Sequence, residues 1–417
     1  MRHTCTRLRR GTVTATAVGA LVVPSAAGTA VAAPASAPAA VTATAPPAPS
    51  PSDTGVRTLT PDVKRQLDQA VQQLMDRTHV PGATVGVWTP HQGQYVKSFG
   101  VADKTTGRPM DPGLYLRIGS ETKTFTVTAL LQLADQGKVG LDDPIGKYVA
   151  GVPNGDSLTL RQLAGMRSGL FNYSDDDGFF KALTSDPQRP FTPQQLLDYS
   201  FQHPVLFPPG QKFDYCNTNL ILLGLVVEKA GGLPLADYLR TRVLAPAGLG
   251  HTLFPRGAEF PQPHAQGYTD QTATGQVEDA ADWNPSWAWA AGAMISDLDD
   301  LRVWARTVAT GVLPDGRTLI SPATQKQRLT TPPTPIAGTG YGLGIFDVQG
   351  WIGHNGSLPG YESLTVYLPS AQATLVVLLN TDIDYRGSEP STVFGETVTR
   401  IVSPQHVFDL PAQPAAR

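Results

Sequence analysis

The sequence contains very little cysteine. Among its 417 residues only Cys5 and Cys216 are cysteines, and Cys5 lies in a segment that we expect to be removed on export. Cys216 is then left without a partner in the same chain. This excludes the disulfide framework that stabilises many small exported domains. The stability of the fold must come from a buried apolar core, and the chain is long enough to form one.

An excess of positive charge is also missing. The chain has 32 lysines and arginines against 35 acidic residues, a formal net charge of -3. Such a balance offers no basic face for nucleic acid and no polybasic stretch for an anionic membrane. We therefore expect the partner to be a small molecule or a peptide.

A long apolar run is absent as well. The apolar stretch from Ala17 to Val23 is far shorter than the roughly 20 residues of a membrane span. It is followed by Ala30-Val31-Ala32, a possible A-x-A cleavage site, and preceded by several arginines (Arg2, Arg7, Arg9 and Arg10). This order is typical of an export signal. We predict that residues 1–32 are a signal peptide and that the protein is secreted, with no membrane attachment after cleavage; Sec and Tat export both remain open.

The rest of the chain divides by composition. Residues 33–55 are rich in alanine and proline and have almost nothing to bury, which predicts a disordered linker. Residues 56–405 form the predicted folded domain and residues 406–417 a tail. Within the domain we expect an α/β part at 56–117 and 290–405, and a mostly helical part at 118–289.

The two ends of this domain carry similar patterns. Near the N-terminus, Thr60 and Pro61 are followed by apolar residues at helical spacing, and two alternating runs at 83–88 and 94–101 indicate a hairpin. Near the C-terminus we expect strands at 341–348, 351–354, 362–368 and 374–380 and a helix at 392–402. The fold class is therefore α/β (α+β): an antiparallel sheet flanked by terminal helices, with a mostly helical insertion.

Three short motifs carry the chemistry. Ser120-Glu121-Thr122-Lys123 stands where an apolar helical pattern begins, so the hydroxyl and the amine share one helix face and a neutral lysine could take the serine proton. Tyr215-Cys216-Asn217 precedes another apolar helix, which lets the phenol and the carboxamide face one cleft. His354-Asn355-Gly356-Ser357 is predicted to end a strand under a glycine-rich turn. No G-x-S-x-G elbow occurs, which argues against an α/β-hydrolase.

In this order the motifs resemble those of the serine penicillin-recognising hydrolases: the D-alanyl-D-alanine carboxypeptidases secreted by actinomycetes and the related class C β-lactamases. The resemblance covers residues 56–405 and implies a β-lactamase/transpeptidase-like fold. It includes further segments: Arg117 to Ser120, Arg167 to Leu170, Ser286 to Ala288 and Gly340 to Gly344.

The resemblance also implies roles for single residues. Ser120 is the nucleophile, Lys123 accepts its proton, and Tyr215 passes a proton to the leaving group. The substrate-binding residues are Asn217, Trp287, His354, Gly356 and Ser357. The backbone N–H groups of Ser120 and Ser357 form the oxyanion hole, and His354 replaces the lysine of many relatives. No metal and no cofactor are implied. Trp287 either walls the cleft or belongs to the core.

One position departs from the family. The carboxypeptidases that the chain resembles have an arginine after the Gly-Tyr-Gly-Leu-Gly segment that holds the carboxylate of the substrate, and here Phe346 stands in its place. We predict that substrates with a blocked C-terminus are tolerated, unless a loop arginine such as Arg167 reaches the same point.

The expected function is that of a secreted serine hydrolase acting through an acyl-enzyme: a D-alanyl-D-alanine carboxypeptidase or D-stereospecific peptidase. A peptidoglycan stem peptide or a β-lactam would be its partner. A β-lactamase, an esterase and a D-amino-acid amidase remain alternatives within the family, and an inactive penicillin- or peptide-binding protein remains an alternative outside the enzymes.

Three further features receive structural interpretations. The acidic run Asp175-Asp176-Asp177 is expected to be solvated and not to bind a metal. Ser296 with Asp299 is expected to form a capping box. Cys216 is expected to point away from the cleft as a small buried filler.

Overall fold

The structure is a computed structural model that describes residues 55–410. The predicted signal peptide and nearly all of the predicted linker lie outside the described residues, as do the last seven residues of the predicted tail. The domain boundaries therefore stay predictions.

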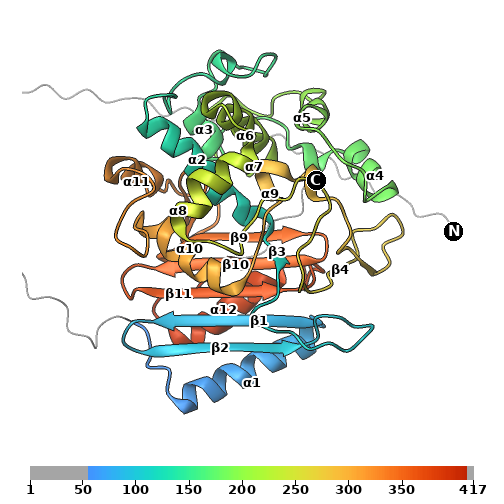
Figure 1. Cartoon of the computed structure of the whole chain (residues 1–417), viewed down its shortest axis with the longest axis vertical. Coiled ribbons are helices and arrows are strands. Elements are labelled where there is room, and N and C mark those ends of the chain that lie inside the picture. Colours follow the sequence, from blue (N-terminus) through green and yellow to red (C-terminus); the bar gives the residue numbers. More distant parts are fainter. Residues whose placement is uncertain (1–54, 411–417) are drawn as a thin grey trace, which may run out of the picture. The chain divides into compact units, whose positions relative to one another are not determined.

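A seven-stranded antiparallel sheet is the centre of the fold (Figure 1), and it confirms the predicted fold class. The first hairpin lies beside the last strand, with Ala83 opposite Leu379. In spatial order the strands are β2 (Gly93–Gly100), β1 (Gly82–Thr89), β11 (Ala373–Leu379), β10 (Tyr361–Leu368), β9 (Trp351–Leu358), β8 (Phe346–Val348) and β7 (Thr339–Tyr341).

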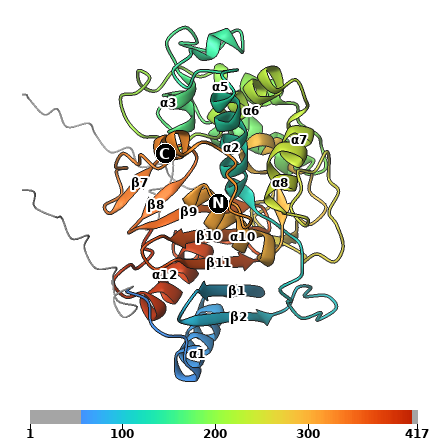
Figure 2. The same ribbon diagram turned by 60° about the vertical axis from the view of Figure 1, so that its left-hand side comes forward.

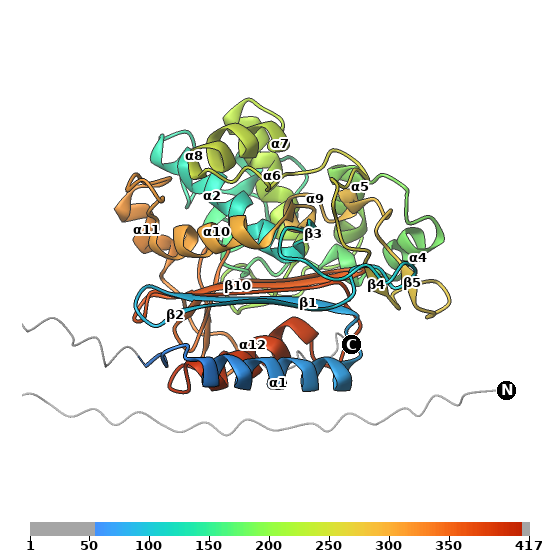
Figure 3. The ribbon, with the colours of Figure 1, turned by 60° about the horizontal axis from the view of Figure 1, so that its bottom comes forward.

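Helices cover both faces of the sheet. The two terminal helices, α1 (Pro61–Thr78) and α12 (Pro390–Val402), lie side by side on one face (Figure 3). Thr60 caps α1 as predicted, because its hydroxyl accepts a hydrogen bond from the Val63 amide. The opposite face carries α10 (Leu298–Thr310) and, further from the sheet, α2 (Thr122–Asp135).

The remaining elements stand mainly on the α2 side of the sheet (Figure 2). The helices are α3 (Leu160–Ala164), α4 (Asp177–Ser185), α5 (Pro193–Phe201), α6 (Asn217–Gly231), α7 (Leu235–Tyr238), α8 (Ala245–Ala247), α9 (Trp289–Gly292) and α11 (Pro322–Arg328). Two-residue strands form two further pairs, β3 (Leu116–Arg117) with β6 (Ile295–Ser296) and β4 (Tyr268–Thr269) with β5 (Glu278–Asp279). Short 3-10 turns include η1 (Gly119–Glu121), η3 (Tyr173–Asp175) and η5 (Pro285–Trp287).

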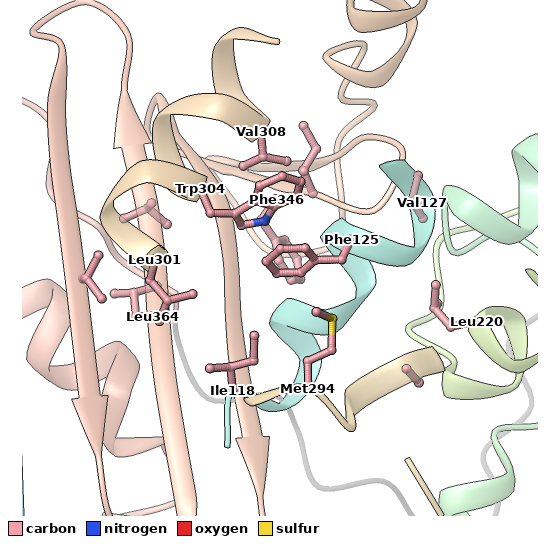
Figure 4. Packing of buried hydrophobic residues seen from close by; sticks show 14 of the residues in the cluster. Ile118, Phe125, Val127, Leu220, Met294, Leu301, Trp304, Val308, Phe346 and Leu364 are labelled. Atoms are coloured by element: carbon pink, nitrogen blue, oxygen red, sulfur yellow. The ribbon is translucent and has the colours of Figure 1, made fainter. Parts of the chain in front are cut away.

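Helix α2 is fixed against α10 by a large aromatic contact. Phe125 stacks on Trp304 with ring centroids 4.0 Å apart (Figure 4). The Trp304 indole donates to the Thr124 hydroxyl at 2.7 Å. Both aromatic rings are fully buried. Burial of rings of this size holds α2 at a fixed distance from the sheet.

No single helix among residues 55–410 is long and apolar enough to cross a membrane. One bent pair, Asn217–Gly231 with Leu235–Ala247, passes the same test on length and composition alone.

Two predicted strands differ from those observed. The single strand predicted at 341–348 is two short strands, β7 and β8, because Gly344 takes a positive φ of 69° and the Gly342 amide bonds to Ile345 O across the turn. The strand predicted to end at His354 continues to Leu358, and the turn comes later, at Gly360 with φ 89°. Gly356 belongs to the strand because its missing side chain leaves room for Ile118 O.

One local interpretation is wrong and another is wrong for one residue, since Asp175 and Asp177 are exposed as predicted but Asp176 is not. Helix α10 is capped by Asp297, whose carboxylate accepts from the Asp300 amide, while the Ser296 hydroxyl is bonded to Thr252. Asp176 is buried and caps α4, where it also bonds to His203 at 2.7 Å. An aspartate that caps a buried helix end gains hydrogen bonds that offset its desolvation, so it is not a solvated member of an acidic run.

Candidate active site

The predicted nucleophile lies on the turn that leads into α2. Ser120 is the middle residue of η1, and its Oγ lies 2.8 Å from the Nζ of Lys123. Gly119 precedes it with φ 50°, and a Cβ at that position would lie 2.6 Å from the Ser357 amide nitrogen. The glycine is needed both for the left-handed backbone and for the close approach of strand β9.

Lys123 is completely buried, and its amine also donates to Ala291 O at 2.8 Å. None of the ion pairs within residues 55–410 includes it. Burial therefore lowers the pKa of Lys123 well below its usual value. A neutral amine at this distance from a hydroxyl can accept the hydroxyl proton.

Tyr215 approaches the same pair from the loop before α6. The Lys123 amine lies 4.9 Å from the centre of the Tyr215 ring. Burial raises the pKa of Tyr215, and a hydrogen bond with Ser120 opposes part of that rise. The phenol is therefore neutral and can give a proton to a leaving group.

Asn217 opens helix α6 and is held by residues that the sequence analysis did not identify. Its amide nitrogen donates to Asn172 Oδ1 at 3.0 Å, and its side-chain amide donates to the Ser174 hydroxyl at 3.2 Å. Cys216 is buried and its thiol points to Leu170 O at 3.5 Å, which fits the predicted filler role.

His354 lies in strand β9 among aromatic rings. Its Nε2 is 3.2 Å from the Tyr341 hydroxyl and its Nδ1 is 2.5 Å from Asn355 O. Burial lowers the pKa of His354 to about 3. The imidazole is neutral, and its ring centre is 6.1 Å from that of Tyr215. No hydrogen bond within the described part of the chain joins the two, so any support of Tyr215 comes through packing and Tyr341.

The backbone around Gly356 and Ser357 forms an open edge of the sheet. Strand β10 pairs with β9 from residue 352 to 358, whereas β8 pairs only with residues 351–353. Residues 354–358 therefore have no strand on their outer side among the described residues. An extended substrate can add there, and the Ser357 amide lies against the Ser120 turn, as an oxyanion hole requires.

Trp287, predicted to bind substrate, and Arg167, considered as a substitute for the missing arginine, both make contacts with other parts of the protein. Trp287 is half-buried in η5, where its ring packs 5.8 Å from that of Phe179 and its carbonyl accepts from the Tyr173 hydroxyl at 2.7 Å. These contacts favour the core interpretation of Trp287. The Arg167 guanidinium donates to Pro333 O at 3.4 Å, and Pro333 lies on the loop before β7.

Phe346 forms part of the aromatic wall of the site. Its ring centre lies 4.9 Å from that of His354 and 4.7 Å from that of Tyr341. Phe346 is only 7% exposed. The position that an arginine occupies in the carboxypeptidases is thus apolar in this chain.

Among residues 55–410, one group of side chains outside this site has metal-ligand chemistry: His251, Asp297 and Asp300. The protein itself already uses both carboxylates. Asp297 caps α10 and bonds to the His251 ring, while Asp300 accepts from the His251 amide and the Thr252 hydroxyl. The group therefore has a structural explanation as a clamp at the start of α10.

The assembled groups are those of acyl transfer. A hydroxyl is next to a neutral amine, a neutral phenol lies close to that hydroxyl, and an open strand edge offers amide donors. This arrangement can form and hydrolyse a covalent ester on Ser120.

Comparison with known proteins agrees with this chemistry. A family model described as Beta-lactamase matches residues 67–391. Protein flp of Staphylococcus aureus (strain N315) is 26% identical over 336 residues, which cover 78% of this chain. The chain spans 65% of the length of that relative.

Two solved structures are similar over most of their length. A D-stereospecific amidohydrolase from Streptomyces sp. has a TM-score of 0.68 and 30% identity, covering 77% of this chain and 94% of the other. The D-amino acid amidase from Ochrobactrum anthropi SV3, complexed with L-phenylalanine amide, has a TM-score of 0.71 and 27% identity, covering 82% and 97%.

Proposed function

Because this chain belongs to the Beta-lactamase family of serine hydrolases, we propose that it is a D-stereospecific peptidase and amidase working through an acyl-enzyme on Ser120. Its substrates are peptides or amides with a D-residue on the acyl side of the scissile bond, including the D-alanyl-D-alanine end of a peptidoglycan stem peptide. The similarity to a D-stereospecific amidohydrolase and a D-amino acid amidase supports this substrate class. We also propose that it acts outside the cell after loss of residues 1–32.

The first half of the reaction uses the three central side chains. Lys123 takes the proton of Ser120 as Oγ attacks the substrate carbonyl carbon. The negative charge that develops on the carbonyl oxygen is stabilised by the amides of Ser120 and Ser357. Tyr215 donates its proton to the leaving nitrogen as the C–N bond breaks, and it recovers a proton from the Lys123 ammonium.

The second half of the reaction frees the enzyme. A water molecule attacks the ester carbonyl and gives its proton to the Lys123–Tyr215 pair. The C–O bond to Ser120 breaks, and Oγ takes the proton back. The carboxylic acid product leaves along the open edge of β9.

The single observation that carries the substrate proposal is Phe346. An aromatic ring cannot make the two charge-assisted hydrogen bonds that a guanidinium makes to a carboxylate. The buried position of Phe346 against His354 and Tyr341 leaves an apolar surface where a strict carboxypeptidase holds the charged terminus. A neutral amide or ester terminus suits this surface better.

We expect kcat/KM for a D-alanyl-D-alanine peptide and for its C-terminal amide to agree within about 10-fold. Phe346→Arg should raise activity on the free acid selectively, and Phe346→Leu, which adds no charge, is the matched control. A preference of the unmodified enzyme for the free acid of about 100-fold or more, roughly 2.7 kcal/mol, would contradict the proposal.

A further inference from the structure

Glu121, the residue directly after the nucleophile, is buried in an unusual way. Its side chain is only 1% exposed, and within the described part of the chain neither carboxyl oxygen has a hydrogen-bond partner of good geometry. None of the described ion pairs includes it. A buried carboxylate without a partner is costly, so a glutamate here requires an explanation.

The surroundings of Glu121 are the strands that carry the oxyanion hole. The Ser363 hydroxyl on β10 donates to Ile118 O at 3.0 Å, next to the η1 turn. Thr365, two residues further along β10, is paired in register with His354, and Ser363 is paired with Gly356. The Thr365 hydroxyl is buried and makes no hydrogen bond of good geometry within residues 55–410, yet it lies close enough to the Glu121 carboxyl to influence its pKa.

The carboxyl of Glu121 is poised to be a hydrogen-bond donor. Burial raises the pKa of Glu121 to about 8, although the nearby hydroxyls of Ser363 and Thr365 act to lower it. A protonated carboxyl has an O–H to give, and the Thr365 oxygen is an acceptor that lacks a donor. A small movement of either side chain joins them.

We propose that Glu121 is a positioning residue whose protonated carboxyl donates to the Thr365 hydroxyl and so holds the Ser120 turn against the strand of His354 and Ser357. This inference rests on the proposed acyl-enzyme function. Its consequence is a fixed spacing between the Ser120 hydroxyl and the Ser357 amide. Loss of the proton breaks the link and leaves a buried anion behind the nucleophile.

The elements around the turn carry a small set of titratable groups, and α11 adds Arg328, whose guanidinium donates to Thr124 O at 3.4 Å. Helix α2 contributes Lys123, strand β9 contributes His354, and strand β10 contributes Glu362. Glu362 belongs to the opposite face of β10 from Thr365, since the two are three residues apart in a strand. Helix α9 contributes no titratable side chain. Lys123 and His354 are neutral, and no charged group is among the causes that shift the pKa of Glu121.

The sign of the pH effect follows from the raised pKa. The folded protein keeps the Glu121 proton up to about pH 8, whereas the unfolded chain loses it near the ordinary value of 4.5. Stability from this group is complete below pH 4.5 and falls as the pH rises toward 8. Glu121→Gln removes this dependence, so its melting temperature relative to the unmodified protein should increase from pH 5 to pH 9.

The kinetic test compares Glu121→Gln with Glu121→Leu. The amide of glutamine can still donate to Thr365, so Glu121→Gln should keep kcat within about 3-fold and lose the fall in kcat above pH 8. Glu121→Leu should lower kcat about 10-fold with KM nearly unchanged, because one hydrogen bond that aligns the transition state is lost. Thr365→Val should lower kcat to the same extent as Glu121→Leu. The double variant that carries both changes should be no slower than either single variant.

Glu278→Gln is the matched control, since Glu278 is exposed on β5 and should leave the pH profile unaltered. An alkaline limb that persists in Glu121→Gln, or full kcat in Glu121→Leu, would overturn the proposal. If the unmodified protein acylated no substrate at all, the proposed function would fail instead. The pH-dependent melting difference of Glu121→Gln would still decide whether its carboxyl is held protonated.

Discussion

Replacing Ser120 with alanine is expected to abolish covalent labelling by penicillin and to reduce hydrolysis of D-residue amides to background. A β-lactam presents the same electrophilic carbonyl as a peptide, but its amine stays tethered after attack and can block the water that would release the acyl group. The Ser120 hydroxyl lies 2.8 Å from a neutral amine. Intact-mass measurement should show one adduct per chain in the unmodified protein and none in Ser120→Ala.

Ser185→Ala is the control for this experiment, because Ser185 is an exposed serine at the end of α4 whose hydroxyl bonds to Lys181 O. It should be labelled as fast as the unmodified protein. An adduct that persisted in Ser120→Ala would remove Ser120 from the nucleophile role. If the unmodified protein hydrolyses amides but is never labelled and does not consume penicillin, the labelling prediction is wrong.

Lys123→Ala and Tyr215→Phe are each expected to lower kcat at least about 100-fold, the scale of lost general acid–base help. Both side chains contact Ser120 and lie on one proton path. The double variant should therefore lose far less than the product of the single losses. Steady-state kinetics on one D-residue amide substrate measures all four proteins of this cycle.

The Lys123 result can be separated from a loss of folding. Burial lowers the pKa of Lys123, so the folded state binds fewer protons there than the unfolded state up to about pH 10.5. Removing the amine should consequently not lower the melting temperature through charge at neutral pH. Lys138→Ala, an exposed lysine on the same part of the chain, should be fully active. Fully multiplicative losses in the double variant would contradict a shared proton path.

Sequence patterns predicted the parts of the fold that are determined by residues close together in the sequence. Thr60 and Pro61 fix the start of α1 through hydrogen bonding and backbone geometry within one turn. The hairpin of β1 and β2 follows from alternation and a polar turn. The order of the three motifs was enough to predict the family to which the chain belongs.

The missed features depend on contacts between distant segments. The turn between β7 and β8 exists because Gly344 packs against Val127 of α2, more than 200 residues earlier. Asn172 and Ser174 hold Asn217 from another loop, and no motif marks them. The Tyr341 hydroxyl meets His354 only after β7, β8 and β9 have paired. The glycine-rich segments were the sequence signal for these contacts, because glycine allows two distant segments of the chain to approach closely.

The pairing of β1 with β11 has a consequence for the order in which the chain can acquire its structure. Strand β1 pairs with β2 on one side, and on its other side it pairs with the much later segment Ala373–Leu379. Until that segment has been synthesised, β1 presents an unpaired edge and β10 lacks its pairing with β11. The entropy cost of closing a loop of this length must be met before the contacts of the central sheet stabilise the fold. A nascent chain can therefore hold Ser120 and Lys123 on a formed helix and still be inert, and catalytic competence is acquired only when the last strand is in place.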